Sequence, residues 1–519
     1  MVIGYQGEEP LMQKSRETWN THTGMILAMI GTEVGRGNIW RFPYLVGSHG
    51  GGSFLIPYLI LLLGVALFGM ISEWVIGRHT RRDPIGAFER IGFPRGRAVG
   101  AWGVAGPFFL YAYYAVITSW VIFFVIASVC RLYYGINTME FFLKFLSSPW
   151  IFVIHAGVVC ITSTILAMGV KRGIERACKF MIPTLFILLI IVVIRSLTLP
   201  GAAAGVEFFM KPRWEYLIDP ATWIAALGQI FFTLSLGMGA MIIYGSYLKD
   251  GWGIPRNAIA VALGNTSSSL LAGFAIFPAA FALGMGNAVA GESSIGLTFL
   301  VLPELFQKMP AGQFFGGIFF LLLTFGAISS AISIQEPSVA WLDEELGWHR
   351  KKSALVTGVI LWLLGLPFLI NGFVTGGLGD KLALLDKMDV IIGQLALPIY
   401  GLISIIAVGW FMKEKGFEEI NKNAVLKLGR RGMAWLKYAV PAFVFLLFLI
   451  TLLQTLQARV SGFPHLIPDT RPVEFIPTGI DLSTILMMLT MCIIIWGGFI
   501  YFTCKVLVTE RGKENRREG

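Results

Sequence analysis

Long apolar stretches recur along the whole chain, and short polar or charged stretches separate them. Each apolar stretch reaches about twenty residues, the length that an α-helix needs to cross the hydrocarbon core of a bilayer. We predict twelve membrane-spanning helices and an all-α integral membrane protein without a separate soluble domain. The predicted spans are 22–47, 53–77, 99–133, 150–169, 177–198, 221–248, 255–285, 313–346, 353–374, 388–412, 435–457 and 481–507.

The first and sixth spans contain residues that interrupt a helix. In the first span, residues 31–38 read GTEVGRGN, with three glycines and two charged side chains at a depth where hydrocarbon is expected. A glycine costs a helix interior about 1 kcal/mol relative to alanine, and an intramembrane charge costs more. We therefore predict that this helix breaks and that a second half-helix starts near Asn38.

The sixth span has a similar interruption at residues 232–239, which read FTLSLGMG. Backbone groups freed inside a membrane must be buried in protein or line a cavity. Freed carbonyls can bind a small hard cation, and the N-terminus of a half-helix attracts a carboxylate. Two breaks five spans apart indicate an inverted repeat of five plus five helices with an ion and solute site between the breaks, spans eleven and twelve being additions.

Composition excludes an ordinary soluble protein, because hydrophobic residues make up 55% of the chain, charged residues 14%, and the mean hydropathy is +0.72. The net charge of +10 could indicate nucleic acid, but the basic residues gather in alternate loops between spans. The positive-inside rule places these loops, and both termini, in the cytoplasm, so we expect a lipid bilayer and no nucleic acid as partner.

The predicted organisation has three parts. Residues 1–21 form a cytoplasmic segment, 22–412 the repeat core, and 413–519 spans eleven and twelve with a basic tail. The first 20 residues lack an apolar signal core, so we expect no cleaved signal peptide. We also expect neither a disulfide nor a zinc site, because the cysteines lie in or beside apolar spans. Short tails and the lack of outward glycosylation motifs favour a prokaryotic plasma membrane. Nothing in the sequence indicates an oligomeric state.

Residues 31–43 and the following GGGSFLIPY at 50–58 resemble the signature of the neurotransmitter:sodium symporter family, which includes the bacterial leucine transporter. The resemblance extends from Trp19 to Met412 and implies the leucine-transporter fold. It also implies a symporter that imports a solute with sodium by alternating access. The chain lacks a Walker GxxxxGK[ST] motif and clustered metal ligands, which argues against ATP-driven transport and against an enzyme.

The resemblance implies two sodium sites made of oxygen ligands. One would use the carbonyl of Glu33, the side chains of Asn38, Thr233 and Asn265, and the substrate carboxylate. The other would use the carbonyls of Gly31, Val34 and Gly326 with the hydroxyls of Ser329 and Ser330. Taken alone, the two serines would be read as small residues at a helix contact.

The resemblance also implies a substrate site, in which the substrate carboxylate meets Tyr114 and the backbone N–H groups near Gly35 and Gly37. Amine transporters of this family carry an aspartate at the position of Gly35, so the glycine favours an amino acid. The rest of the substrate would meet a mainly apolar lining that leaves little room for a charge. Its residues are Leu110, Phe232, Thr233, Ser235, Met238, Ser330 and Ile334. We predict a small, neutral, apolar amino acid.

Glu33 and Arg36 depart from the small and apolar residues that are usual at these positions in the family. They could neutralise each other as a pair three residues apart. Alternatively, Glu33 could add charge beside a sodium ion or bind an amine, betaine or guanidino solute. A channel or a transport-dead sensor with the same fold is a further alternative.

Tyr58, Gln229, Thr233, Asn265 and Ser269 match the chloride site of chloride-dependent family members. A bound chloride would offset the sodium charges in a low-dielectric site, although Glu33 could supply that charge instead. For the gates, Arg41 with Asp389 resembles the outer pair and Arg16 with Glu344 the inner pair, near Trp19, Ser246 and Tyr247. Glu73, inside the second span, is expected to be structural.

Overall fold

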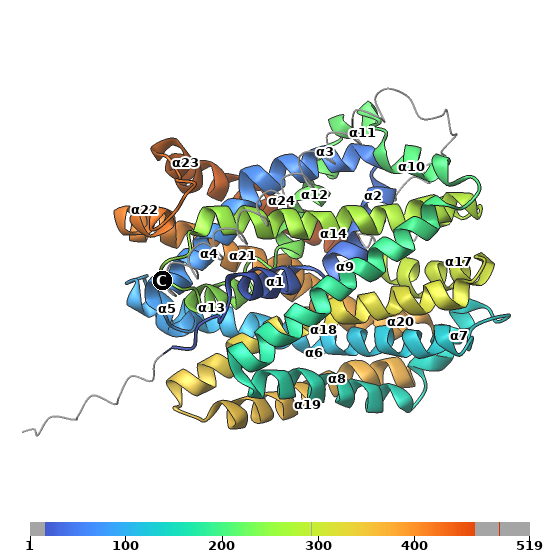
Figure 1. Ribbon diagram of the computed structural model, residues 1–519, viewed down its shortest axis with the longest axis horizontal. Coiled ribbons are helices and arrows are strands. Elements are labelled where there is room, and N and C mark those ends of the chain that lie inside the picture. Colours follow the sequence, from blue (N-terminus) through green and yellow to red (C-terminus); the bar gives the residue numbers. More distant parts are fainter. Residues whose placement is uncertain (1–15, 292, 462–486, 488–519) are drawn as a thin grey trace, which may run out of the picture.

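The computed structural model describes residues 16–291, 293–461 and 487, and these residues form helices and no strand. The long helices run roughly parallel in one bundle (Figure 1). Nine helical stretches of the described residues are long and apolar enough to cross a membrane. They are Gly52–Thr80, Gly96–Val129, Trp150–Ala167, Val170–Leu197, Ile254–Ala282, Gly312–Glu345, Arg350–Val374, Leu378–Met412 and Arg430–Ile450.

The first and sixth predicted spans are present as broken helices. The first consists of α1 (His22–Glu33), the π-helix η1 (Arg36–Arg41) and α2 (Phe42–Ser48), and the sixth of α12 (Pro220–Thr233) and α13 (Ala240–Ser246). The prediction of spans one to eleven is therefore confirmed. The twelfth predicted span, 481–507, lies outside the described residues apart from residue 487.

The unbroken spans consist of α-helices and short π-helical turns. Spans two to five are α3 (Gly52–Leu61), η2 (Leu62–Ala66) and α4 (Leu67–Thr80); α6 (Gly96–Val129); α8 (Trp150–Ala167); and η3 (Val170–Ile174) with α9 (Glu175–Leu197). Spans seven to nine are α14 (Ile254–Ala282), α18 (Gly312–Glu345) and α19 (Arg350–Val374). Spans ten and eleven are η5 (Asp389–Ala396), α21 (Leu397–Ile406) and η6 (Ala407–Met412), then η7 (Trp435–Ala439) and α24 (Val440–Ser461).

Shorter helices connect the spans at the two ends of the bundle. They are α5 (Pro84–Arg90), α7 (Thr138–Leu146), α10 (Ala202–Met210), α11 (Trp214–Ile218), α15 (Gly286–Gly291), α16 (Ser294–Gly296), η4 (Leu297–Val301), α17 (Leu302–Lys308), α20 (Leu378–Met388), α22 (Glu414–Asn421) and α23 (Arg430–Ala434). α5 and α22 lie at the end that carries the first described residues, and α7, α10 and α17 lie at the opposite end (Figure 1). We call the first of these the N-terminal end.

Helices differ in how much of their surface other helices cover. Among the 18 most apolar consecutive residues of each helix, 89% are buried in α14 and 83% in α18, whereas in α8 the share is 33%. The outer helices expose large apolar side chains such as Ile161, Phe180 and Leu355. Exposed apolar surface on this scale suits contact with lipid. The inner helices, which lipid does not reach, therefore hold the polar residues of the site.

The first break is shorter than predicted. α1 continues through Gly31 and ends at Glu33, Val34 is extended (φ −76°, ψ 110°), and η1 already begins at Arg36, two residues before Asn38. Gly31 stays helical and lies close to α9: a Cβ atom there would lie 3.1 Å from Ile182 Cδ1 and 3.3 Å from Cys178 Sγ. This glycine serves close helix packing, and the break begins after it.

The second break spans residues 234–239, between α12 and α13. Ser235 (φ 51°), Gly237 (φ 79°) and Gly239 (φ 63°) all adopt the left-handed region, which ends a right-handed helix. The freed N–H of Gly237 donates to the buried carboxylate of Glu73 on α4 (2.8 Å). Glu73 thus satisfies a backbone group that the break exposes, in agreement with the structural role expected for it.

Gly237→Ala tests the geometry of the second break. A Cβ atom at this left-handed position would overlap the carbonyl oxygen of Leu397, so we expect a loss of about 2–3 kcal/mol in the free energy of unfolding. Thermal unfolding in detergent measures this loss. Gly251→Ala is the control, because no atom lies within 4 Å of the added Cβ. Equal midpoints for the two variants would contradict the geometry described.

Candidate functional site

The two breaks lie against each other in the middle of the bundle. The Ser235 hydroxyl, in the second break, donates to the carbonyl of Thr32 at the end of α1 (3.0 Å). A Cβ atom on Gly37 would lie 3.2 Å from the Thr233 hydroxyl oxygen. The prediction that the breaks meet is therefore confirmed by the geometry, and the residues around them lie close enough to form one site.

One cluster of oxygens joins the end of α1 to α18. The Ser330 hydroxyl lies 3.4 Å from the carbonyl oxygens of both Gly31 and Val34, and the Ser329 hydroxyl donates to the Gly326 carbonyl (3.0 Å). All five residues come from the set predicted for one sodium site. Hydroxyl and carbonyl oxygens are the ligands that a hard monovalent cation prefers. We call these five residues the α1–α18 oxygen cluster.

Gly35 allows this cluster to form. A Cβ atom at Gly35 would lie 2.7 Å from the Ser330 hydroxyl oxygen and 3.0 Å from the Gly326 carbonyl oxygen. The same position is 3.3 Å from the Tyr114 hydroxyl oxygen. Any larger residue would therefore fill the space in which the break, α6 and α18 approach each other.

A second cluster joins η1, α12 and α14. The Asn38 side-chain amide donates to Asn265 Oδ1 (2.6 Å), and the Thr233 hydroxyl donates to Asn38 Oδ1 (3.0 Å) and lies 3.3 Å from Asn265 Oδ1. These are the three side chains predicted for the other sodium site. Among the described residues, no hydrogen bond joins the Glu33 carbonyl to this cluster.

Hydrogen-bond donors surround the second cluster. Ser269 accepts from the Asn38 amide (2.9 Å), and the Gln229 amide donates to the Gly37 carbonyl (2.6 Å). Asn265 Nδ2 is buried and makes no hydrogen bond among the described residues, and the buried Tyr58 hydroxyl lies beside the hydroxyls of Thr266 and Ser269. An unsatisfied buried donor costs about 1–3 kcal/mol, so this environment fits an anion better than an apolar group.

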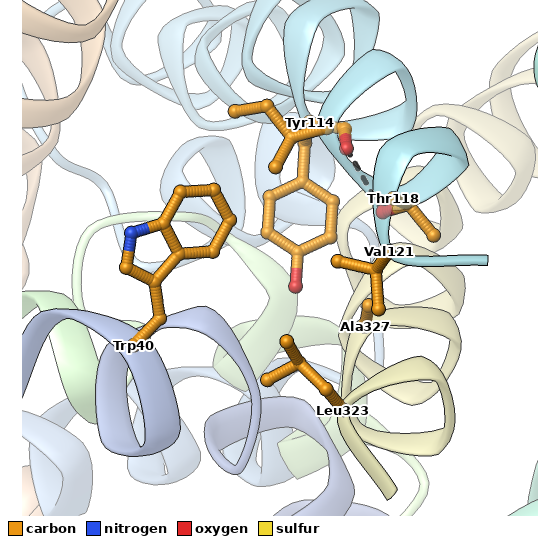
Figure 2. Close-up of a pocket in the computed structure, with 7 residues that line it drawn as sticks. Trp40, Tyr114, Thr118, Val121, Leu323 and Ala327 are labelled. Atoms are coloured by element: carbon orange, nitrogen blue, oxygen red, sulfur yellow. Dashed lines mark hydrogen bonds between the residues drawn. The ribbon is translucent and has the colours of Figure 1, made fainter. Parts of the chain in front are cut away.

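A small cavity of about 10 Å³ lies beside Tyr114, between η1, α6 and α18. Figure 2 shows the Tyr114 ring pointing into it, with Trp40 on one side and Val121 on the other. Ile117, Thr118, Leu323 and Ala327 also line it. Of these seven residues the sequence predicted only Tyr114, because an apolar residue in a membrane helix has no distinguishing pattern.

The predicted contacts for a substrate side chain come from three elements. Leu110 lies on α6, Ser330 and Ile334 lie on α18, and Phe232, Ser235 and Met238 lie at or in the second break. All are buried except Phe232, which is half-buried. That these six side chains line one substrate pocket stays a prediction.

Glu33 is a buried carboxylate at the edge of the site. Its exposed fraction is 3%, and neither side-chain oxygen has a hydrogen-bond partner among the described residues. A buried charge without a partner is strongly destabilising. The side chain of Arg36 lies outside the described part of the structure, so the predicted pairing of Glu33 with Arg36 is not tested.

Contacts between the segment before α1 and residues of α13 and α18 close the N-terminal end of the bundle. Arg16 forms an ion pair with Glu344, donates to the Ser246 hydroxyl (2.7 Å), and its guanidinium lies 4.8 Å from the centre of the Tyr247 ring. The Trp19 backbone N–H donates to the Tyr247 carbonyl (3.1 Å). The residues predicted for an inner gate are thus in mutual contact.

A second layer behind this end was not predicted. Arg350 at the start of α19 donates to both carboxylate oxygens of Glu336 (2.8 Å each), and the Tyr247 hydroxyl donates to the same carboxylate (2.5 Å). Glu336 is fully buried in α18. A glutamate inside an apolar span was a signal available in the sequence, but its partner could not be inferred from spacing.

At the opposite end, Arg41 lies over the Phe232 ring, 5.0 Å from its centre, and Asp389 accepts a hydrogen bond from the Tyr113 hydroxyl (3.2 Å). The pairing of Arg41 with Asp389 in an outer gate stays a prediction.

Comparisons with known proteins agree with this architecture. The family model described as the sodium:neurotransmitter symporter family matches residues 16–138 and 150–505. An uncharacterized sodium-dependent transporter of Methanocaldococcus jannaschii is 37% identical over 441 residues, 82% of this chain and 87% of that protein. The sodium- and chloride-dependent taurine transporter of Rattus norvegicus is 30% identical over 411 residues, 69% of this chain and 66% of that protein.

Among solved structures, MhsT in complex with L-phenylalanine matches with a TM-score of 0.75 and 36% sequence identity. The match covers 84% of this chain and 99% of that one. At this identity and coverage the fold is shared. The predicted fold class is confirmed.

Arg350→Gln tests the layer behind the N-terminal end. Removing the guanidinium leaves the Glu336 carboxylate buried without its cation, so we expect the free energy of unfolding to fall by about 3–5 kcal/mol. Adding Glu336→Gln should restore part of the loss, which thermal unfolding measures. Lys351→Gln, at an exposed neighbouring position, is the control. A double variant no more stable than Arg350→Gln would refute the proposed pairing.

Proposed function

The chain belongs to the sodium:neurotransmitter symporter family, and on that basis we propose that it imports a small, neutral, apolar amino acid together with sodium ions. It is a sodium-dependent multi-pass membrane transporter and not an enzyme. The observation that carries the proposal is the meeting of the two breaks, which directs backbone and hydroxyl oxygens toward one region of the bundle.

Two sodium ions are the proposed coupling ions. The α1–α18 oxygen cluster would hold one, because three carbonyls and two hydroxyls converge there without a competing positive charge among them. The cluster of Asn38, Thr233 and Asn265 would hold the other. Because Val34 and Gly35 belong to the break itself, a bound ion would stabilise the broken conformation of α1 and couple sodium to the substrate site.

The substrate carboxylate would bind between the two clusters. The start of η1 presents N–H groups near Gly35 and Gly37, and the Tyr114 hydroxyl lies beside Gly35. An amino acid supplies that carboxylate, whereas an amine lacks it. The related structure with bound L-phenylalanine supports an amino acid, and the apolar lining supports an uncharged side chain.

Alternating access would depend on the two ends of the bundle. We assign the N-terminal end to the cytoplasm of a prokaryotic cell and the plasma membrane as the location, following the basic loops. The contacts of Arg16 and Trp19 close that end in this structure. Their separation would release sodium and substrate inward.

A second candidate is a solute with a cationic group, such as an amine, betaine or guanidino compound. The observation that favours it is the buried carboxylate of Glu33, which has no partner among the described residues. A cationic group would neutralise this carboxylate. The apolar lining and the glycine at position 35 favour the amino acid instead.

Chloride is proposed as an additional ion. Asn265 Nδ2 has no partner among the described residues and the Tyr58 hydroxyl lies beside Ser269, and a chloride at these groups would offset the charge of two sodium ions in a low-dielectric site. The rat relative named as chloride-dependent is consistent with this role. Glu33 is the competing source of negative charge.

Purified protein in liposomes tests the transport reaction. An inward sodium gradient should drive saturable accumulation of phenylalanine or another neutral apolar amino acid, and Ser329→Ala with Ser330→Ala should abolish the sodium dependence. Thr324→Ala on the same helix is the control, because the Thr324 hydroxyl donates to the Phe320 carbonyl one turn earlier in that helix. Sodium-independent passive flux would identify a channel, binding without flux a sensor, and accumulation of amines alone the second candidate.

Replacing chloride by gluconate tests the third ion. We expect a clear loss of uptake, because an anion-free site would hold two uncompensated sodium charges. Uptake that is unchanged in gluconate argues against a chloride site. Glu33→Gln should then be measured in both salts, since chloride dependence that appears only in this variant assigns the compensating charge to Glu33.

A further inference from the structure

Two glutamates connect the segment before α1 to the start of span five. The Glu175 carboxylate, at the first residue of α9, accepts from the backbone N–H groups of Asn20 (2.6 Å) and Thr21 (3.1 Å). In the reverse direction, the Glu17 carboxylate accepts from the backbone N–H of Val170, the first residue of η3 (2.6 Å). Each segment therefore supplies a carboxylate that binds the backbone of the other.

Glu175 also completes the N-terminal cap of α1. The Thr21 hydroxyl accepts from the Gly24 N–H (3.1 Å) and donates to Glu175 (2.7 Å), so a chain of hydrogen bonds leads from the first turn of α1 to the carboxylate. A negative charge at a helix N-terminus is stabilised by the helix dipole. A side chain at Gly24 would overlap Glu175, so the glycine permits this approach.

The start of span five is shaped to make the reverse contact. Gly169 has φ +82°, which ends α8 and turns the Val170 N–H toward Glu17. Lys179, one turn into α9, pairs with Glu175 (2.8 Å) and holds its carboxylate in place. The Glu175 side chain is buried, whereas its partners Asn20 and Lys179 are partly open to solvent.

These contacts bear on the closed N-terminal end, because α1 is the half-helix that separates the breaks from that end. Arg16 and Trp19 bind α1's leading segment to α13 and α18, whereas Glu17 and Glu175 bind it to η3 and α9 on another side. We propose that Glu17 and Glu175 act as a reciprocal clamp that positions α1 in the closed arrangement, and that opening of the N-terminal end requires its release. The inference needs no particular substrate.

Cys178 provides a reporter inside the chain. It lies one turn after Glu175 and is 1% exposed, and its Sγ atom faces α1 at the position of Gly31. Because Cys178 is buried and lies against α1, movement of α1 away from α9 would expose its thiol to a water-soluble reagent. The other cysteines, Cys130, Cys160, Cys492 and Cys504, are replaced by serine so that labelling reports this site alone.

The experiment measures the rate at which a water-soluble maleimide labels Cys178 in the full-length protein, with sodium or with potassium as the only cation. Glu17→Ala and Glu175→Ala should each label on the order of tenfold faster in sodium, because charge-assisted hydrogen bonds to the backbone are lost. Glu175→Gln, which keeps an acceptor oxygen, should give an intermediate rate and also serves if the alanine variant does not fold.

Glu304→Ala is the matched control, since Glu304 also pairs with a lysine four residues later but lies on α17 at the opposite end. Unchanged labelling in both Glu17→Ala and Glu175→Gln would overturn the clamp. A variant with a lower unfolding midpoint but the wild-type ratio of the labelling rates in sodium and in potassium would also overturn the clamp. A purely structural role gives that result. Labelling needs no transport, so a failure of the clamp is distinguishable from a failure of the proposed function.

Discussion

The need to satisfy backbone N–H and C=O groups inside a membrane governs this structure. Nine long helical stretches of the described residues satisfy theirs internally, but the breaks after Glu33 and Thr233 expose groups at mid-bundle. Side chains from other helices meet some of them: Glu73 accepts from Gly237, and Ser235 donates to the Thr32 carbonyl. The carbonyls of Gly31 and Val34 lie near the Ser330 hydroxyl, and we propose that sodium binds between these oxygens.

Small residues make that arrangement possible. Gly31, Gly35 and Gly37 lie where a side chain would meet α9, α18 and α12, respectively. The stretch that first reads as a weak helix is thus also a surface that three neighbours approach closely. Buried charged side chains also need partners. Glu336 and Arg350 pair with each other, whereas Glu33 has no hydrogen-bond partner among the described residues.

Sequence reasoning identified the spans and both breaks because hydropathy and glycine content are local properties. It also listed residues that the structure brings together, such as Ser330 with Val34 and Asn38 with Thr233, but through a family resemblance and not from spacing alone. It placed the start of η1 two residues late, since Gly31 packs against α9 instead of breaking the helix. The pairs formed by Glu336 and by Glu175 were missed, because their partners are set by tertiary packing that no spacing encodes.

The central claim is that the break after α1 leaves carbonyl oxygens that bind sodium together with oxygens of α18. A high-resolution experimental structure determined in sodium and again in potassium tests it most directly. We predict ion density enclosed by the carbonyls of Gly31, Val34 and Gly326 and the hydroxyls of Ser329 and Ser330 in sodium, and its loss in potassium. A continuous helix through residues 34 and 35, or the same empty cluster in both salts, would contradict the claim.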